Sequence, residues 1–282
     1  MPPFRHLLSR SSSVKTFQRC ALVLGHPGHE LKVFGWTSEH RPRVYLITDG
    51  SGHQGTPRTL STAALITQLG SDPGEVFGCV SDVEIYRAML EGDCALFLRL
   101  VDQLADSFLK HEIDMVAGDA AEGFNPTHDI CRALIDAAVL KVQRATGKTI
   151  DNLEFSLTEW EQNSPQPQHD DHCLHFILDD DLLAAKLSAA QTYVELKNEV
   201  RAAIAQRGEE YFRVECLRKV IEPAPHVGRT EPAYETWGRQ RVREGKYQTV
   251  IRFREHILPI MNAVLNYAVH AAPEPSLVVS KR

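Results

Sequence analysis

The chain has 282 residues, 43% of them hydrophobic, and a formal net charge of −6 at pH 7. This length accommodates one sizeable α/β domain with a helical appendage, and the acidic balance gives no general reason to expect nucleic acid or an anionic membrane as a partner. No apolar run approaches the roughly 18–20 residues that a membrane-spanning helix needs.

The first 18 residues are basic and rich in serine. Their apolar stretch is too short for a secretory signal, so we expect a flexible leader over 1–18, with an organellar transit peptide as the alternative. The six cysteines include no C-x-x-C pair. We expect Cys79, Cys94 and Cys131 to be buried thiols in a reducing compartment, which makes the cytoplasm the default location.

Short apolar runs alternate with helical patterns along the first half of the chain. The runs are typical of buried strands and lie at 20–25, 43–48, 76–81 and 113–117. Helical periodicity occupies 59–69, 93–110 and 129–146. This alternation predicts an α/β three-layer sandwich with a mostly parallel, Rossmann-like sheet.

The second half is predicted to be largely helical. After an expected strand at 173–178, one long helix is predicted over 180–205, continuing beyond Gly208 through 209–220. A last helical region is expected over 239–269, and its apolar stripe should pack on the main domain or on a second subunit. We therefore expect a main domain at 19–220 and a C-terminal helical extension and tail at 221–282.

Polar clusters follow several predicted strands, at 26–30, 49–53 and 119–128. In an open parallel sheet, ligands bind outside the carboxyl ends of the strands. These clusters should therefore converge on one edge of the sheet.

Histidines stand out in two of these clusters. His26 and His29 flank Pro27-Gly28, and His128 lies at the start of a predicted helix. Three imidazoles with one open position are a familiar catalytic zinc arrangement. In a chain with 13 histidines, surface or core histidines are the alternative explanation. We predict one site for Zn²⁺ or another divalent first-row metal, held by His26, His29 and His128.

These motifs resemble the PIG-L/LmbE-like metal-dependent deacetylases. That family opens with Ala-His-Pro-Asp-Asp-Glu after its first strand, where this chain has Gly-His-Pro-Gly-His-Glu at 25–30. The family's His-Pro-Asp-His before a helix corresponds to Asn-Pro-Thr-His at 125–128, and Asp119 lies in a similar lead-in. The similarity extends in order over about residues 19–216. It implies an LmbE-like fold and metal-dependent removal of an N-acetyl group.

The resemblance also implies roles for individual residues. His26 and His128 match the two metal-binding histidines, and His29 stands where the family has a metal-binding Asp. Gly28 replaces the family's general base, which is the main departure. Asn125 replaces a histidine that helps to stabilise the oxyanion, so Asn125 is our candidate for that role.

A hydrolase without a base at position 28 needs a carboxylate from another loop. Asp119 is the preferred candidate, Asp49 the second, and Glu122 a third. The resemblance implies hydrolysis of an amide in an N-acylated, sugar-like small molecule. The alternatives are a non-catalytic family member that binds metal or ligand or acts in a glycan-modifying complex, and acyl or glycosyl transfer at the same site.

Weaker signals favour structural explanations. The cluster at 169–175 fits an exposed loop, because strand alternation would separate its histidines. His53 also fits an exposed loop, because it lies in a glycine-flanked segment. The basic stretch 239–254 is offset by acidic residues and fits a solvated helix face or a contact in a homo-oligomer. The Gly-x-Gly at 50–52 lacks the rest of a dinucleotide fingerprint, so no nicotinamide cofactor is expected.

Overall fold

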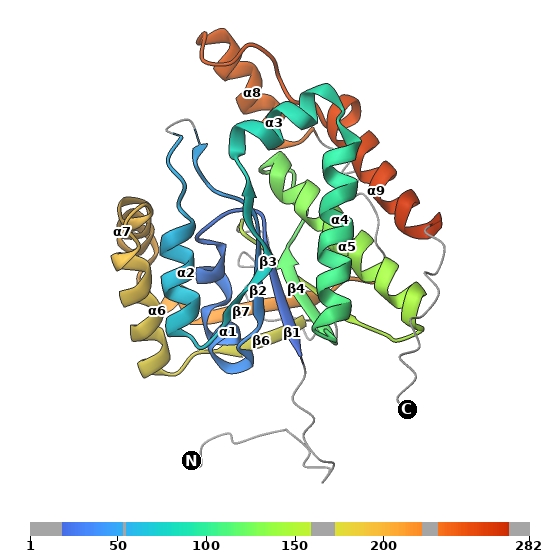
Figure 1. The fold of residues 1–282 in the computed structure, drawn as a ribbon. Helices are drawn as coiled ribbons and strands as arrows, with labels where there is room; N and C mark the ends of the chain where they lie inside the picture. The colour runs from blue at the N-terminus through green and yellow to red at the C-terminus, as the bar shows by residue number, and fades with distance from the viewer. Residues whose placement is uncertain (1–18, 53–54, 159–172, 222–230, 271–282) are drawn as a thin grey trace, which may run out of the picture.

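A computed structural model describes residues 19–52, 55–158, 173–221 and 231–270. Its centre is a seven-stranded sheet in the order β3-β2-β1-β4-β5-β7-β6 (Figure 1). The strands are β1 (Cys20–Leu24), β2 (Arg43–Thr48), β3 (Asp72–Val80), β4 (Met115–Asp119), β5 (Asp151–Phe155), β6 (Cys173–Ile177) and β7 (Val214–Lys219).

The sheet is mostly parallel. β1 pairs in parallel with β2 and with β4, and parallel pairing continues to β3 at one side and to β5 at the other. Only β7 runs against its neighbours β5 and β6. The predicted α/β class with a mostly parallel sheet is therefore confirmed.

Helices cover both faces of the sheet (Figure 1). One layer contains α1 (Phe34–His40), α2 (Thr59–Gln68), α6 (Asp180–Thr192) and α7 (Lys197–Arg207). The opposite layer contains α4 (Cys94–Lys110), α5 (Pro126–Thr146) and α9 (Leu258–His270), while α3 (Asp82–Glu91) and α8 (Ala233–Arg243) lie at the end of the sheet. Short helical turns complete the fold at 29–33, 209–212 and 253–257.

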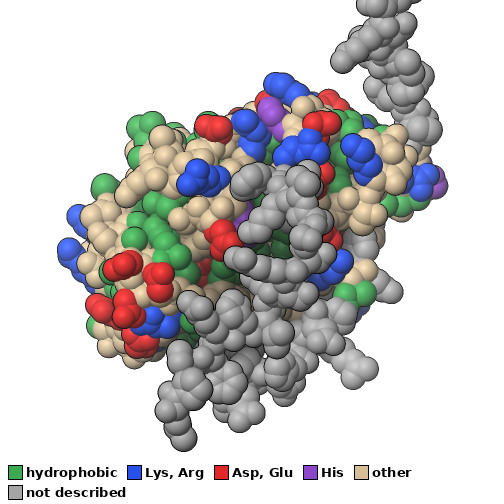
Figure 2. Space-filling view, turned by 90° about the horizontal axis from the view of Figure 1, so that it is seen from below, with side chains coloured by type: hydrophobic (Ala, Val, Ile, Leu, Met, Phe, Trp, Pro, Cys, Tyr) green, Lys and Arg blue, Asp and Glu red, His purple; other side chains and the backbone are tan. Residues whose placement is uncertain are grey.

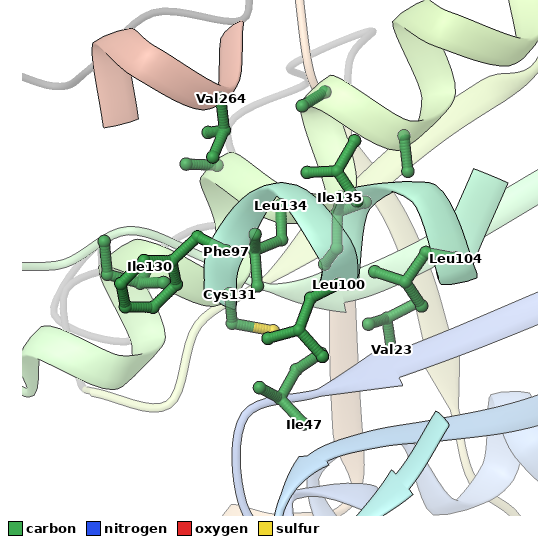
Figure 3. Packing of buried hydrophobic residues seen from close by; sticks show 14 of the residues in the cluster. Val23, Ile47, Phe97, Leu100, Leu104, Ile130, Cys131, Leu134, Ile135 and Val264 are labelled. Atoms are coloured by element: carbon green, nitrogen blue, oxygen red, sulfur yellow. The ribbon is translucent and has the colours of Figure 1, made fainter. Parts of the chain in front are cut away.

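Alternation along β1 explains why two cores form. Ala21 and Val23 belong to the cluster shared with α4, α5 and α9, and Leu22 and Leu24 to the cluster under α1 and α2. Figure 3 shows the first cluster, in which Val23 lies below side chains of α4 and α5. A strand buried on both faces reads as a continuous apolar run, which is why β1 and β2 were predictable.

The C-terminal region was expected to pack its apolar stripe, and it does. Ile257, Ile260, Met261 and Val264 are buried in the same core as α4 and α5. The single helical region expected over 239–269 is instead α8, a non-helical stretch, one π-helical turn at 253–257 and α9. Domain boundaries at 18 and 220 stay predictions.

Several expected elements differ from the structure. The helix predicted to continue after Gly208 is wrong, because β7 occupies Val214–Lys219 and pairs with two strands. The long helix expected over 180–205 is divided between α6 and α7, since Tyr193 ends α6 with its hydroxyl hydrogen-bonded to Thr62. Cys79, expected to be buried, is exposed.

Some expectations concern residues that the structure does not describe. The leader, the tail from 271, His53 and the loop histidines 169 and 172 lie outside the described residues. Among the helices of the described residues, none is long and apolar enough to cross a membrane. On the face drawn in Figure 2, basic and acidic side chains are interspersed.

Candidate metal centre

The candidate site lies where the strand order reverses. β2 and β4 flank β1 on opposite sides, so the chain leaves β1 at the topological switch point where open α/β sheets bind ligands. The loop after β1 carries His26 and His29, and β4 ends on Asp119. α5 begins at Pro126 and carries His128 in its first turn.

The three predicted histidines come together. The ring centroids of His29 and His128 are 4.7 Å apart, and the ring of His26 lies 5.3 Å from His128 and 5.5 Å from His29. His26 and His128 are buried and His29 is partly buried. Residues more than a hundred positions apart in the sequence thus form one imidazole cluster.

Asp119 fixes the orientation of His29. Its Oδ2 lies 2.8 Å from His29 Nδ1 and accepts a hydrogen bond of 2.7 Å from the Gly25 amide. A Cβ at position 25 would lie 2.9 Å from the same oxygen, so glycine allows this close approach. Burial opposes ionisation of Asp119, but the charge and hydrogen bond of His29 lower the pKa of this carboxyl. A carboxylate held in this way fixes both the tautomer and the ring orientation of its histidine.

His26 has a different set of partners. Its Nδ1 lies 2.7 Å from Thr48 Oγ1 at the end of β2 and 3.5 Å from Asp82 Oδ1 at the start of α3. Burial would raise the pKa of Asp82, but the hydrogen bond and charge of His26 lower it. Asp82 was not singled out in the sequence. It lies two residues past the end of β3, so the rule that selected the other strand ends also applies to it.

The donor set fits a metal ion. Among the described residues, the ligand atoms of His29, Asp119 and His128 all lie within 4.8 Å of one another, a set that includes Asp119 and lacks the predicted His26. The buried atoms His26 Nε2, His128 Nδ1 and Asp119 Oδ1 have no hydrogen-bond partner in this part of the chain. Buried polar atoms are normally satisfied, so these atoms call for a ligand. Burial and the neighbouring His29 hold the pKa of His128 well below its usual value, which favours the neutral imidazole that binds metals.

The remaining sequence candidates occupy different positions. Asn125 lines the cleft and caps α5, accepting a hydrogen bond of 2.8 Å from the Thr127 amide through Oδ1. Asp49 lies away from the cleft lining, and its Oδ1 accepts from the amides of Ser51 and Asp82. Glu122 accepts hydrogen bonds from the 156–158 segment. The site roles of these residues stay predictions.

The backbone at position 28 favours glycine. Gly28 has φ 99°, a left-handed conformation that favours glycine, and a Cβ there would lie 2.3 Å from Leu196 Cδ1. Its amide donates to Oε2 of the fully buried Glu30 at 2.8 Å. The loop therefore holds His26 and His29 inward by a bend to which an aspartate at position 28 is poorly suited.

A cleft of about 1250 Å³ opens at the imidazole cluster. His26, His29, His128 and Asp82 line one part of it. Further lining comes from α3, from residues between Tyr234 and Ile251, and from other segments that include Lys32, Arg58 and Glu199. Arg241 and Lys246, from the basic stretch that was expected to face solvent or an oligomer partner, line this cleft, whereas Arg239 forms an ion pair with Glu231.

Comparison with known proteins finds similarity at the level of the fold. No protein-family model and no curated protein matches the chain. A crystal structure of the zinc-inhibited form of the teicoplanin deacetylase Orf2 has a TM-score of 0.50 and 11% identity. A deacetylase–bog complex in the biosynthesis pathway of teicoplanin has a TM-score of 0.51 and 13% identity. Each comparison covers 72% of this chain and 98% of the other. At these identities the similarity shows the fold alone.

Proposed function

We propose that this protein is a metal-dependent amide hydrolase and a divergent member of the PIG-L/LmbE-like deacetylases. Its substrate would be an N-acylated, sugar-like or otherwise polar small molecule. The observation that carries the proposal is the cluster of three imidazoles, with unpartnered buried atoms, at the topological switch point of the sheet. The motif order in the sequence and the deacetylase names of the two structural neighbours support the same reaction class.

His26, His29 and His128 would hold the metal, for which Zn²⁺ fits the imidazole set best. Bound there, the metal would supply Lewis acidity that polarises the amide carbonyl and lowers the pKa of a water molecule. Asp119 fixes the ring of His29, and Thr48 and Asp82 fix the ring of His26.

The reaction adds water across the C–N bond of the amide. The water oxygen bonds to the carbonyl carbon, the C–N bond breaks, and a water proton goes to the departing nitrogen. Asp82 lines the cleft, whereas Asp119 is fully buried with one oxygen engaged by two donors. We therefore assign Asp82 to handling the proton and Asp119 to positioning His29, with the unpartnered Oδ1 of Asp119 available as a further metal ligand. Asn125, at the edge of the cleft, would donate to the oxyanion.

The non-catalytic alternative rests on Gly28, because no side chain at that position can take a proton. In this alternative, the protein binds the metal and a ligand but does not catalyse hydrolysis. A cytoplasmic location and a homo-oligomeric state stay predictions.

The test is metal analysis of the protein purified without added metal, followed by assay on a panel of N-acetylated sugars. We expect about one zinc per chain, release of free amine, and loss of both in His128→Ala. Exposed His270→Ala is the matched control and should keep both. Full metal occupancy without turnover on any amide or ester would favour the non-catalytic alternative. Absence of metal binding would overturn the proposal.

A further inference from the structure

The cleft exposes an unusual set of large apolar side chains beyond the imidazoles. Four of its large apolar lining residues are at least one-third exposed: Val83 at 61%, Leu90 at 37%, Phe124 at 42% and Trp237 at 44%. Isolated apolar residues on a surface need no explanation, but several gathered in one concave region mark a binding site.

One wall of this region is the outer face of α3. Val83, Arg87 and Leu90 are spaced so that they share one face of the helix, and all three line the cleft. The opposite face of α3 is buried in the core through Ile85 and Met89. The orientation of α3 is thus set by core packing, which leaves its second apolar face directed at the cleft.

The other wall comes from the C-terminal region. The ring of Trp237 on α8 meets Phe124 edge-on with centroids 4.8 Å apart. The ring of Phe124 lies over His128, with centroids 6.4 Å apart and planes inclined by 23°. A row of rings therefore leads from the imidazole cluster to α8, and Figure 1 shows α3 and α8 at the same end of the molecule.

We propose that α3 and the segment from Tyr234 to Ile251 form a second subsite that binds an apolar group, alkyl or aryl, of the substrate. This inference rests on the proposed function, since the imidazoles would hold the scissile amide of the same molecule. The occupant follows from continuity, because the exposed apolar side chains and the three histidines line a single cleft. The Tyr234–Ile251 segment lies beyond the residues whose motifs resemble the deacetylase family, so the resemblance itself does not imply this wall.

The charged residues of this wall fit an apolar occupant better than an anionic one. Arg241 lies 3.4 Å and Lys246 2.8 Å from the carboxylate of Glu244. Arg87 is accompanied in the lining by the acidic Glu91. The apolar side chains of this wall would contribute most of the binding free energy, because a ligand that covers them removes apolar surface from water.

The experiment measures affinity against chain length with the full-length, Zn²⁺-loaded protein. One series consists of N-acylglucosamines from acetyl to octanoyl, and the other of N-acetylglucosamine alkyl glycosides from methyl to octyl. Calorimetry gives Kd for compounds that are not turned over, and KM and kcat are measured for those that are. We expect affinity to rise up to about fourfold per added methylene until the subsite is filled. The series that shows the rise identifies the part of the substrate that carries the apolar group.

Two variants and a control tie this rise to the subsite. Leu90→Ser and Trp237→Ala should flatten it, and both side chains are exposed enough for the fold to tolerate the change. Leu60→Ser is the matched control, because Leu60 is 82% exposed and lies outside the cleft lining. It should leave the rise intact.

The outcomes separate this inference from the proposed function. Length-dependent binding without turnover supports the subsite and counts against the hydrolase. Turnover with affinity independent of chain length in both series supports the hydrolase and overturns the subsite. A rise that survives both cleft variants, or no binding of any compound, also overturns the subsite.

Discussion

Two site histidines each contact a carboxylate, and these carboxylates differ in their access to the cleft. Asp119 is fully buried against His29, whereas Asp82 contacts His26 and lines the cleft. A carboxylate that only orients a metal ligand acts on metal affinity. A carboxylate that handles a substrate proton acts on turnover at full metal occupancy.

Asn substitutions at these positions should therefore separate the two roles. Asp119→Asn is expected to weaken metal binding about 10–100-fold, because the hydrogen bond that fixes His29 loses its charge. Asp82→Asn is expected to lower kcat about 10²–10⁴-fold at saturating metal. Metal titration and steady-state kinetics check both values. Asp72→Asn is the control, since the Asp72 side chain is 80% exposed and lies outside the cleft lining.

Loss of turnover in Asp119→Asn with metal retained would instead make Asp119 the base. An Asp82→Asn protein as active as the parent would remove Asp82 from the reaction.

The histidines could be proposed from sequence because they follow strand ends that apolar runs mark clearly. Asp82 was missed because only Ser81 separates β3 from α3, so no loop with a cluster of polar residues marks this strand end. The available signal was Ser81-x-x-Glu84, which forms a capping box and places a helix start at Asp82.

At the scale of elements, a buried ion pair connects β7 to α6, and the same carboxylate contacts α1. Lys186 Nζ on α6 lies 2.9 Å from Oε1 of Glu215 on β7, and both side chains are buried. Glu215 also accepts hydrogen bonds from the amides of Gly35 and Trp36 in α1. β7 was not predictable from local pattern, since its sequence has helical spacing. Its strand conformation depends on pairing with β5 and β6 and on this contact from α6.

Removing one partner of this pair should therefore be costly. Lys186→Met leaves the Glu215 charge buried, and we expect a loss of about 3–5 kcal/mol in the free energy of unfolding. Denaturant titration measures it. Lys110→Met is the matched control, because Lys110 pairs with Glu75 while 67% of its side chain is exposed, and a loss below about 1 kcal/mol is expected. A loss below about 1 kcal/mol in Lys186→Met would show that β7 does not depend on this pair.

At the scale of the whole molecule, the C-terminal region is part of the main core and of the cleft. α9 contributes buried side chains to the cluster of α4 and α5, while the segment before it lines the cleft. The fold class could be predicted because strands buried on both faces leave continuous apolar runs. The contribution of the C-terminal region to the cleft could not, since it depends on how a distant helix docks on α5.

This architecture predicts that a single charge on the inner face of α9 destabilises the entire domain. Val264 is fully buried and lies against α5 in Figure 3. Val264→Asp places a carboxylate among buried apolar side chains, and we expect a loss of at least about 3 kcal/mol. That is a large part of the roughly 5–15 kcal/mol available to a domain. Asn266→Asp puts the same charge two positions along on the exposed face of α9 and should change stability by less than about 0.5 kcal/mol. The measurement is thermal unfolding of both variants, followed through probes in the core and in the cleft. We expect one cooperative transition, shifted only in Val264→Asp. An unshifted core transition would mean that α9 folds as a separate appendage.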